Sequence, residues 1–399
     1  MLVEPTTVDD VSATLARASR EKLRVAIRGA GTKKGWGPPP QPADIELSTR
    51  RLNAVLAHRH GDLTATVQAG AALADVNREL ARHRQWIPLD PPFSDRATIG
   101  GIVATNDSGP RRHRYGAPRD LIIGVDIVRT DGVAAKAGGI VVKNGAGYDV
   151  GRLMTGSFGS LAVITSATFK LFPIPPASRT VVVDGGSARL SADRLCAIAS
   201  SVASSQLTPT AVEIETASGG TTRLLVRFES IDAAVAQQAA HAAEIASGNG
   251  ATASIASGED ETLLWKAHGD CIWDKRGAVV KMTMLPADAA PMLAWISNAL
   301  RDVEWEVVGR IALGVLLVRV EAVVGKQASF VTDLRARFPP GRGGAVIVRG
   351  SDELKAVVDA WGPIGDSVAV MQAIKKQFDP DAILNPGPWS AELDRSARL

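Results

Sequence analysis

The feature that most constrains this chain is a strand-like run that leads directly into a glycine-containing turn. Residues 23–27 are mostly apolar, and Arg28-Gly29-Ala30-Gly31-Thr32 follows them without a linker. Such a turn brings backbone N–H groups together, and converging donors of this kind bind anions. A second glycine-rich stretch, Thr98 to Gly109, offers the same chemistry. Two backbone cradles predict a ligand that carries phosphate groups.

The first loop does not fit the dinucleotide fingerprint of NAD-dependent dehydrogenases. That fingerprint is G-x-G-x-x-G at a strand-to-helix turn, with an acidic residue about 20 positions further on. Residues 28–34 are R-G-A-G-T-K-K, so Lys34 stands where the third glycine is required. We therefore reject a Rossmann NAD dehydrogenase.

The order of the expected elements divides the chain into three parts. Residues 1–176 begin with a helix after Thr7 and continue as short strands around the two glycine loops, up to a cluster of prolines. Residues 177–350 follow the order β-α-β-β-α twice, which resembles a ferredoxin-like antiparallel sheet covered by helices. Residues 351–399 contain two helices and the turn signals Asp379-Pro380 and Asn385-Pro386-Gly387, which are typical of a docked segment.

Composition excludes several classes of protein. The chain has 399 residues and a formal net charge of +3, spread along the sequence and not gathered as in a nucleic-acid binder. The dense basic patch Arg111-Arg112-His113-Arg114 is either a solvated loop or a surface that faces an anion. Two distant cysteines, Cys196 and Cys271, predict a reducing, cytoplasmic setting. With no signal peptide and no apolar stretch of about 18 residues, we expect membrane contact only through partners.

Five segments, in order, resemble the vanillyl-alcohol oxidase / p-cresol methylhydroxylase (PCMH) flavoprotein superfamily. They are Arg28–Thr32; Thr98–Gly101 with Ala104-Thr105-Asn106 and Gly109; Tyr115-Gly116 with Asp120; Gly156–Leu161 with Ile164-Thr165; and Phe378-Asp379-Pro380 with Ile383–Gly387. Within the superfamily, Lys143–Asp149 with Arg152-Leu153 is similar to the FAD-binding subunit of bacterial glycolate oxidase. The segments are spread over nearly the whole chain.

The resemblance implies an α+β fold. We expect a two-subdomain, PCMH-type FAD-binding domain at residues 1–176 and a ferredoxin-like antiparallel cap for the substrate at residues 177–350. A C-terminal segment, residues 351–399, is expected to pack back on the FAD-binding domain.

The resemblance also implies a set of FAD-binding residues. They are Arg28, Gly29, Ala30, Gly31, Thr32, Thr98, Gly100, Gly101, Thr105, Asn106, Gly109, Gly159, Ile164 and Asn385. Covalent FAD in this superfamily is usually attached to a His or Cys in a loop. The first loop here has Thr32 and Lys33, and neither cysteine lies in a matching segment. We therefore expect non-covalent FAD.

Hydride transfer from a 2-hydroxy acid requires a cation for the carboxylate and a base for the hydroxyl proton. Arginine suits the first task because it binds carboxylates in a bidentate manner. The candidate cations are Arg114, Arg276, Lys281, Arg310, Arg319 and Arg349. Arg349 is favoured because it ends an expected cap strand. Tyr115 and Tyr148, the two tyrosines, are candidates either to line the flavin or to pack in the core. The sequence identifies no general base.

The implied function is oxidation of a small 2-hydroxy acid such as glycolate or D-lactate. Electrons would pass to an iron–sulfur partner or a quinone, and a second flavoprotein subunit and an iron–sulfur subunit are the implied partners. The related dehydrogenase subunits carry a metal-binding histidine cluster near the C-terminus, whereas the last histidine here is His268. We therefore expect no metal, and a non-catalytic FAD-binding accessory subunit stays open as the alternative. A sugar-lactone oxidase is disfavoured because its covalent-linkage histidine is absent.

Overall fold

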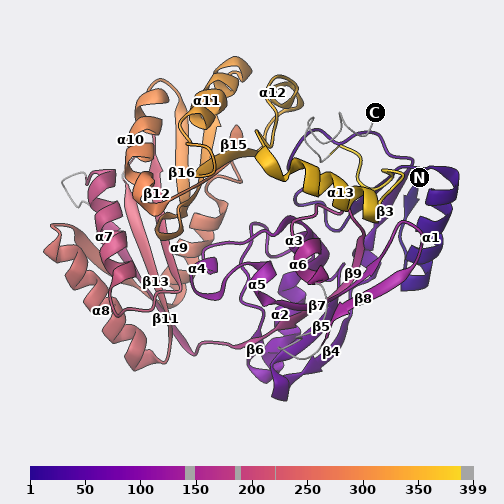
Figure 1. The fold of residues 1–399 in the computed structure, drawn as a ribbon. Coiled ribbons are helices and arrows are strands. Elements are labelled where there is room, and N and C mark those ends of the chain that lie inside the picture. Colours follow the sequence, from indigo (N-terminus) through magenta and orange to yellow (C-terminus); the bar gives the residue numbers. More distant parts are fainter. Residues whose placement is uncertain (140–148, 185–189, 221, 388–399) are drawn as a thin grey trace. The chain divides into compact units, whose positions relative to one another are not determined.

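The computed structural model describes residues 1–139, 149–184, 190–220 and 222–387 (Figure 1). The chain forms two compact units. Unit 1 consists of Met1–Gly109, Tyr115–Ile174 and Pro363–Leu399, and unit 2 of Pro110–Arg114 and Pro175–Gly362. Residues 110–114 therefore belong to unit 2, although the residues before and after them in the sequence belong to unit 1.

Unit 1 contains two principal sheets in the described part of the chain. One is parallel, with the order β1-β3-β2, and the other is antiparallel, with the order β4-β5-β9-β7-β8; β6 pairs with β10. The strands are β1 Leu2–Val3, β2 Val25–Arg28, β3 Ile45–Ser48, β4 Val55–Arg59, β5 Thr64–Gln68, β6 Gln85–Trp86, β7 Ile122–Val128, β8 Ala134–Gly138, β9 Val163–Lys170 and β10 Phe172–Pro173. The turn Thr130-Asp131-Gly132 joins β7 to β8, and the two strands pair as an antiparallel hairpin.

The helices of unit 1 are short, apart from the first and the last. They are α1 Val8–Glu21, α2 Leu73–Leu80, α3 Ile99–Thr105, α4 Arg112–Tyr115 (shared with unit 2), α5 Pro118–Leu121, α6 Val150–Met154 and α13 Val368–Phe378. The expected helix after Thr7 is confirmed, since the Thr7 hydroxyl accepts from the N–H of Asp10, whose carboxylate accepts from the N–H of Thr7. Such a capping box satisfies backbone donors that a helix start leaves unpaired.

Residues 98–109 differ from the expected loop because α3 occupies most of them. Ile99, Ile102 and Val103 fall at helical spacing and are fully buried. Burial of these side chains offsets the low helix propensity of Gly100-Gly101. Asn106 ends the helix in the left-handed conformation, with φ of 48°.

The C-terminal segment returns to the first sheet of unit 1. The N–H of Val25 donates to the carbonyl of Ile383, and the N–H of Asn385 donates to the carbonyl of Val25, both at 2.8 Å. Leu384 thereby forms a parallel bridge with Val25 of β2. Ile383 and Leu384 are buried with α1 residues in one cluster. The pairing fixes the backbone that precedes Pro386.

Unit 2 is built on an eight-stranded antiparallel sheet in its described residues, with the order β14-β11-β13-β12-β16-β17-β15-β18. The strands are β11 Ala177–Asp184, β12 Ala211–Ala217, β13 Arg223–Ser230, β14 Thr252–Ala256, β15 Ala278–Met284, β16 Glu304–Arg310, β17 Val315–Glu321 and β18 Gly343–Arg349. The helices are α7 Ala192–Ser204, α8 Asp232–Gly248, α9 Gly258–Asp270, α10 Ala289–Ala299, α11 Val324–Ala336 and α12 Asp352–Val357. The expected mixed fold with an antiparallel cap sheet is confirmed.

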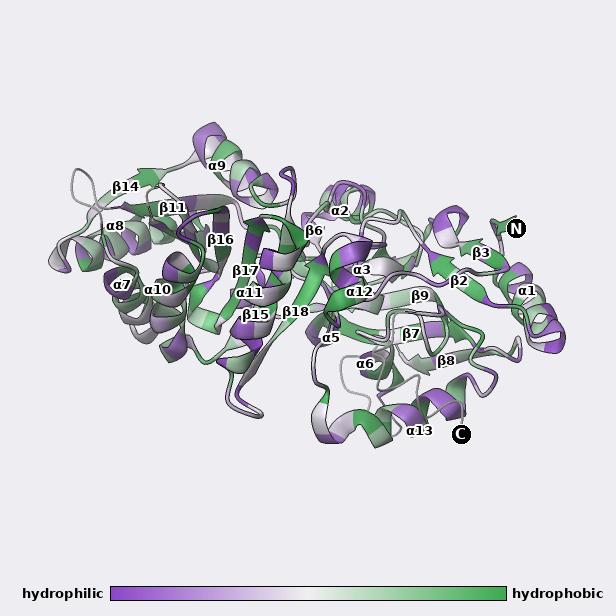
Figure 2. Cartoon of the chain, turned by 90° about the horizontal axis from the view of Figure 1, so that it is seen from above, coloured by the Kyte–Doolittle hydropathy of each residue, from purple (hydrophilic) through white to green (hydrophobic). Residues whose placement is uncertain are grey.

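The two faces of this sheet differ in chemistry. Helices α7, α8, α10 and α11 cover one face and bury its apolar side chains, such as Val212 and Ile214, in a single core (Figures 1 and 2). Because side chains alternate along a strand, Glu213 and Glu215 point to the opposite face, where α9 lies. Residues 351–362, expected to begin the returning segment, belong to unit 2, since Leu354 and Ala360 are buried in that core.

A histidine clamp joins α9 to the charged face. His268 Nδ1 lies 2.6 Å from Glu215 Oε1, and its Nε2 lies 3.2 Å from Glu213 Oε2. Both ring nitrogens can donate only when the ring is protonated. Although burial lowers the pKa of His268, the hydrogen bonds with the two carboxylates raise it to about 9. Arg223 pairs with the other oxygen of Glu215.

We expect the free energy of unfolding of unit 2 to fall as the pH rises from about 6.5 to about 9. The folded pKa of His268 exceeds its ordinary value of 6.5, so the clamp's contribution is complete below pH 6.5 and is lost as the pH rises through about 9. The loss amounts to about 3 kcal/mol at most. Urea unfolding at a series of pH values measures it. His268→Gln should abolish this dependence of the free energy of unfolding on pH. His241→Gln, the control at an exposed histidine, should retain it. The same pH dependence in both variants would contradict a stabilising role of the His268 ion pairs.

Candidate functional site

A pocket in unit 1 is formed where β2, α3 and the C-terminal segment meet. Its empty space is about 1230 Å³, the open side included. Most of the residues expected to bind a cofactor line it, namely Arg28, Gly29, Ala30, Gly31, Thr32, Thr98, Gly100, Gly101, Thr105, Gly159, Ile164 and Asn385. Asn106 and Gly109 lie outside this lining; Asn106 ends α3, and Gly109 packs against the backbone of Asp90. The structure therefore brings together residues from both glycine loops and from the chain's last described turn.

The first loop approaches the start of α3 so closely that only glycine fits. A Cβ atom at Gly29 would lie 2.0 Å from Thr98 Oγ1 and 3.0 Å from Thr98 Cβ. Thr98 itself is fixed in extended conformation just before α3. The absence of a side chain at Gly29 leaves the loop backbone close to the first turn of the helix. A backbone cradle of this kind fits a phosphate-bearing cofactor.

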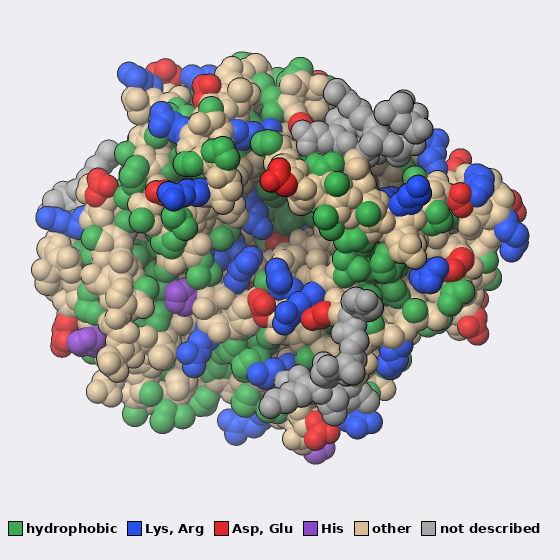
Figure 3. All heavy atoms as spheres, in the orientation of Figure 1, with side chains coloured by type: hydrophobic (Ala, Val, Ile, Leu, Met, Phe, Trp, Pro, Cys, Tyr) green, Lys and Arg blue, Asp and Glu red, His purple; other side chains and the backbone are tan. Residues whose placement is uncertain are grey.

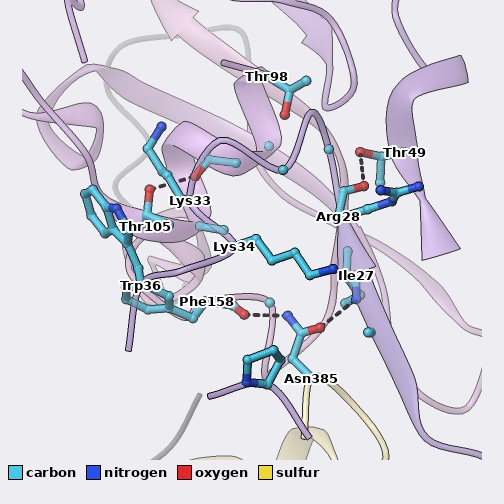
Figure 4. Close-up of a pocket in the computed structure, with 18 of the residues that line it drawn as sticks. Ile27, Arg28, Lys33, Lys34, Trp36, Thr49, Thr98, Thr105, Phe158 and Asn385 are labelled. Carbon is cyan, nitrogen blue, oxygen red and sulfur yellow. Dashed lines mark hydrogen bonds between the residues drawn. The ribbon is translucent and has the colours of Figure 1, made fainter. Parts of the chain in front are cut away.

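Asn385 ties the C-terminal segment to both β2 and the turn after α6. Its Oδ1 accepts from the N–H of Ile27, and its Nδ2 donates to the carbonyl of Phe158, both at 2.6 Å (Figure 4). Gly159, with φ of +68°, passes so close that a Cβ there would lie 2.6 Å from Asn385 Nδ2. Asn385 therefore holds one wall of the pocket in place through two hydrogen bonds, whatever else it contacts.

Three cations line the pocket, and two of them are paired with carboxylates. Arg28 Nε lies 2.5 Å from Glu46 Oε1, and Lys33 Nζ lies 3.1 Å from Asp107 Oδ2, with both side chains of the second pair buried. Lys34 points across the pocket toward the side of Ile27 and Asn385 (Figure 4). No carboxylate of the described residues forms an ion pair with Lys34. Its charge is the one the pocket can offer most directly to an anion.

We expect Lys34→Ala to weaken FAD binding about fivefold, which corresponds to about 1 kcal/mol for an ion pair open to solvent. Lys34→Arg should bind as tightly as the wild type because the charge is kept. Titration of the apoprotein, followed by quenching of flavin fluorescence, gives the two dissociation constants. The alanine effect should shrink at high salt; an unchanged affinity in Lys34→Ala at low salt would remove Lys34 from the site.

The three substrate candidates occupy different places. Tyr115 packs edge-to-face against Trp86 and Phe172, with ring centroids 6.1 and 5.1 Å away. Arg349 donates to the carbonyls of Gly277, Trp273 and Ile272 at 3.1, 2.8 and 2.9 Å, within unit 2. Tyr148 lies outside the described residues. The contacts of Tyr115 and Arg349 favour structural roles, and substrate contact stays a prediction for all three.

Sequence reasoning missed several residues of the pocket. Lys33, Lys34, Trp36 and Phe158 line it together with the predicted set. The two consecutive lysines in the glycine loop could have indicated these residues, because a nearby positive charge strengthens the binding of an anion to such a loop. The pairing of Lys33 with Asp107 had no signal in the sequence, since the two residues are far apart along the chain. None of the described residues forms a group of His, Cys, Asp or Glu suited to hold a metal ion.

Family models match both parts of the chain that form this pocket. Residues 1–138 match the FAD binding domain, and residues 356–389 match the C-terminal domain of FAD linked oxidases. The chain is related to the FAD-linked oxidases. This confirms the resemblance to the vanillyl-alcohol oxidase / PCMH superfamily that the five segments indicated.

Curated relatives match the chain over less than half of its length. It is 34% identical over 181 residues to glycolate oxidase subunit GlcD of Bacillus subtilis (45% of this chain, 38% of the relative). Identity is 35% over 173 residues to a D-lactate dehydrogenase of Archaeoglobus fulgidus (43% and 39%) and 34% over 163 residues to glycolate oxidase subunit GlcE of Escherichia coli (41% and 46%). The matches therefore also span less than half of these relatives.

Solved structures share the fold of nearly the whole chain. An alkyldihydroxyacetonephosphate synthase superposes with a TM-score of 0.74 at 18% identity, covering 96% of this chain and 75% of that one. A glucooligosaccharide oxidase of Acremonium strictum superposes with a TM-score of 0.69 at 15% identity, covering 96% and 88%. At these identities the similarity concerns the fold. In the part of the chain that the structure describes, the helices are too short or too polar to cross a membrane.

Proposed function

We propose that unit 1 binds FAD without a covalent link and that the chain oxidises a small 2-hydroxy acid, such as glycolate or D-lactate. The observation that carries the proposal is the pocket that joins the Gly29 loop, the start of α3 and Asn385. FAD, when bound, supplies the acceptor for a hydride. The loop backbone and Lys34 would hold its phosphates, and Gly159 and Ile164 would lie against the nucleotide.

A non-covalent FAD is supported by the residues available in unit 1. A glucooligosaccharide oxidase of known structure carries 6-S-cysteinyl, 8α-N1-histidyl FAD. Both cysteines of this chain, Cys196 and Cys271, belong to unit 2, and no histidine lines the pocket in its described residues. Denaturation in acid should therefore release the flavin into the supernatant after precipitation of the protein.

The proposed electron acceptor is an iron–sulfur partner or a quinone, and a second flavoprotein subunit is a proposed partner. The names of two relatives, GlcD and GlcE, describe subunits of glycolate oxidase. The match to GlcE also supports a second function, a non-catalytic FAD-binding accessory subunit. Lys and Arg side chains lie among Asp and Glu side chains on the face shown in Figure 3. A cytoplasmic location stays a prediction from the cysteine content.

The first experiment is an absorbance spectrum of the purified protein, followed by anaerobic addition of glycolate or D-lactate. Flavin bands that bleach with substrate are the expected result. A protein without flavin bands, even after reconstitution with FAD, would overturn the central proposal. Bands that persist with every 2-hydroxy acid tested would favour the accessory-subunit function, and the partner would then be sought by co-purification.

A further inference from the structure

A buried ion pair joins the first glycine loop to the far end of α3. Lys33 Nζ lies 3.1 Å from Asp107 Oδ2, and the two side chains are 7% and 6% exposed. Lys33 belongs to the loop that lines the pocket, and Asp107 follows Asn106, the residue that ends the helix. These residues all belong to unit 1. The pair therefore connects the two glycine-rich segments within one unit.

The position of Asp107 requires a positive charge nearby. Its Oδ2 is buried and accepts no hydrogen bond from the described residues. It also lies just beyond the C-terminal end of α3, and such an end carries partial negative charge from its unpaired carbonyl groups. A buried carboxylate without a counter-charge is costly. The ammonium group of Lys33 offsets this cost, so the second glycine-rich segment depends on the first.

The first loop has backbone hydrogen bonds that lie wholly within it. The N–H of Lys34 donates to the carbonyl of Gly31 at 3.2 Å, and the N–H of Trp36 donates to the carbonyl of Lys33 at 3.0 Å. These bonds close turns inside the loop and do not tie it to α3. Gly31 has φ of +74°, a conformation that suits glycine but leaves the unbound chain many alternatives. A contact with α3 therefore restrains the loop in a way that its own turns do not.

The loop contacts α3 at both ends of the helix. Gly29 packs against Thr98 just before the first turn of α3, and Lys33 binds Asp107 just after its last turn. The helix has seven residues and is therefore about 10 Å long. The loop residues between the two contacts, 30–32, line the pocket. Their backbone is therefore held from both sides.

We propose that the Lys33–Asp107 pair orders the first glycine loop before the cofactor binds. Both are positioning residues, and the inference rests on the proposed function, in which the cofactor is FAD. A loop that becomes ordered only during binding lowers the affinity, and a loop that is ordered in advance avoids this cost. Lys33 and Lys34 extend in different directions from the loop (Figure 4). Lys33 therefore holds the loop, whereas Lys34 offers its charge to the phosphates.

Asp107→Asn tests the proposal because charge and loop order predict opposite results. By charge alone, the loss of a carboxylate near a site for phosphates should tighten the binding of FAD. If the pair orders the loop, the same variant should bind FAD about tenfold more weakly, because the loop must then become ordered during binding. Titration of the apoprotein, followed by quenching of flavin fluorescence, measures the dissociation constant. Asp75→Asn, which removes a carboxylate from an exposed ion pair on α2, should match the wild type.

Lys33→Met and the double variant Lys33→Met/Asp107→Asn complete a thermodynamic cycle. Each single variant should bind FAD about tenfold more weakly, and the double variant should bind no more weakly than the weaker single one, because the pair can be broken only once. Asp107→Glu keeps the carboxylate and should regain part of the affinity. Independent effects, about a hundredfold in the double variant, would overturn the coupling of the two residues.

A second measurement does not depend on FAD. Hydrogen exchange of the full-length apoprotein, followed by mass spectrometry, reports how often the backbone of each segment opens. Residues 29–36 should exchange faster in Asp107→Asn than in the wild type, whereas α1 should exchange at the same rate in both. Equal acceleration in α1 would indicate a general loss of stability and would overturn a specific role in the loop.

The two measurements separate this inference from the proposed function. If the wild type binds FAD and Asp107→Asn binds it as tightly or more tightly, the ordering role fails although the proposed cofactor stands. Tighter binding would mean that Asp107 competes with the phosphates for Lys33. If the wild-type apoprotein binds no FAD, the proposed function fails, and the exchange of residues 29–36 still decides whether the pair orders the loop.

Discussion

Gly29→Ala is expected to weaken FAD binding at least about tenfold, which corresponds to about 1.4 kcal/mol. The added methyl group would lie 2.0 Å from Thr98 Oγ1, so the first loop would have to move away from α3. Backbone donors that converge on a phosphate lose their geometry when such a loop moves. Titration of apoprotein with FAD measures the change.

Gly35→Ala provides a matched control for this prediction. It makes the same substitution in the same loop, but its Cβ would meet nothing within 4 Å. We expect wild-type affinity in this variant. Thr98→Ala should partly rescue Gly29→Ala, because it removes the nearest clashing atom. Equal affinities for Gly29→Ala and Gly35→Ala would show that the close approach of loop and helix is irrelevant to the cofactor.

Asp379→Ala is expected to lower the free energy of unfolding by about 3–5 kcal/mol, the usual effect of breaking a buried ion pair. Asp379 is 1% exposed, and its carboxylate accepts from Lys375 Nζ at 2.5 Å and from the N–H groups of Ile383 and Leu384 at 3.0 and 2.9 Å. Its loss leaves two backbone donors unsatisfied and removes the counter-charge of Lys375, whose ammonium group keeps the carbonyls of Ser160 and Leu384 as partners. Denaturant unfolding measures the stability, and FAD titration reports the accompanying loss of Asn385 from the pocket.

Asp381→Ala is the control for this prediction. It tests whether the loss of stability depends on where the carboxylate lies in the turn and not only on the loss of a negative charge. Asp381 pairs with Lys22 at 2.6 Å, but the two side chains are 32% and 66% exposed. Exposed pairs of this kind contribute about 0–1 kcal/mol. A loss in Asp379→Ala no larger than that in Asp381→Ala would contradict the anchoring role of Asp379.

Elements with a clear periodic pattern were predictable from the sequence. The helix after Thr7 has apolar residues at helical spacing and acidic residues in its first turn, and it forms α1. The turn at Asn385 was predictable as well, because Asn-Pro-Gly is a strong turn signal. The hydrogen-bond partners of Asn385 were not predictable from the sequence. Ile27 and Phe158, the two partners, each lie more than 200 positions before Asn385 in the chain.

The charged face of unit 2 shows why the rest was beyond sequence reasoning. Helix α9 has no apolar stripe, because two of the side chains it buries are Glu261 and His268, and its Leu263 is 57% exposed. Hydrophobic periodicity therefore misses the helix. Glu213 and Glu215 alternate with buried apolar residues, a pattern that predicts solvent-facing carboxylates. In the structure both carboxylates are instead covered by their ion-pair partners. These partners come from a separate helix and separate strands, which a sequence pattern does not bring together.

The parallel bridge between Leu384 and Val25 has a consequence for biosynthesis. Translation of the roughly 350 residues between Arg28 and Asn385 takes about 20–70 s at typical rates of elongation. During that interval the nascent N-terminal part has its glycine loops but lacks the residue that closes one wall of the pocket. The ribosome must therefore translate Asn385 before a complete pocket exists, and the finished cofactor site cannot form before that step.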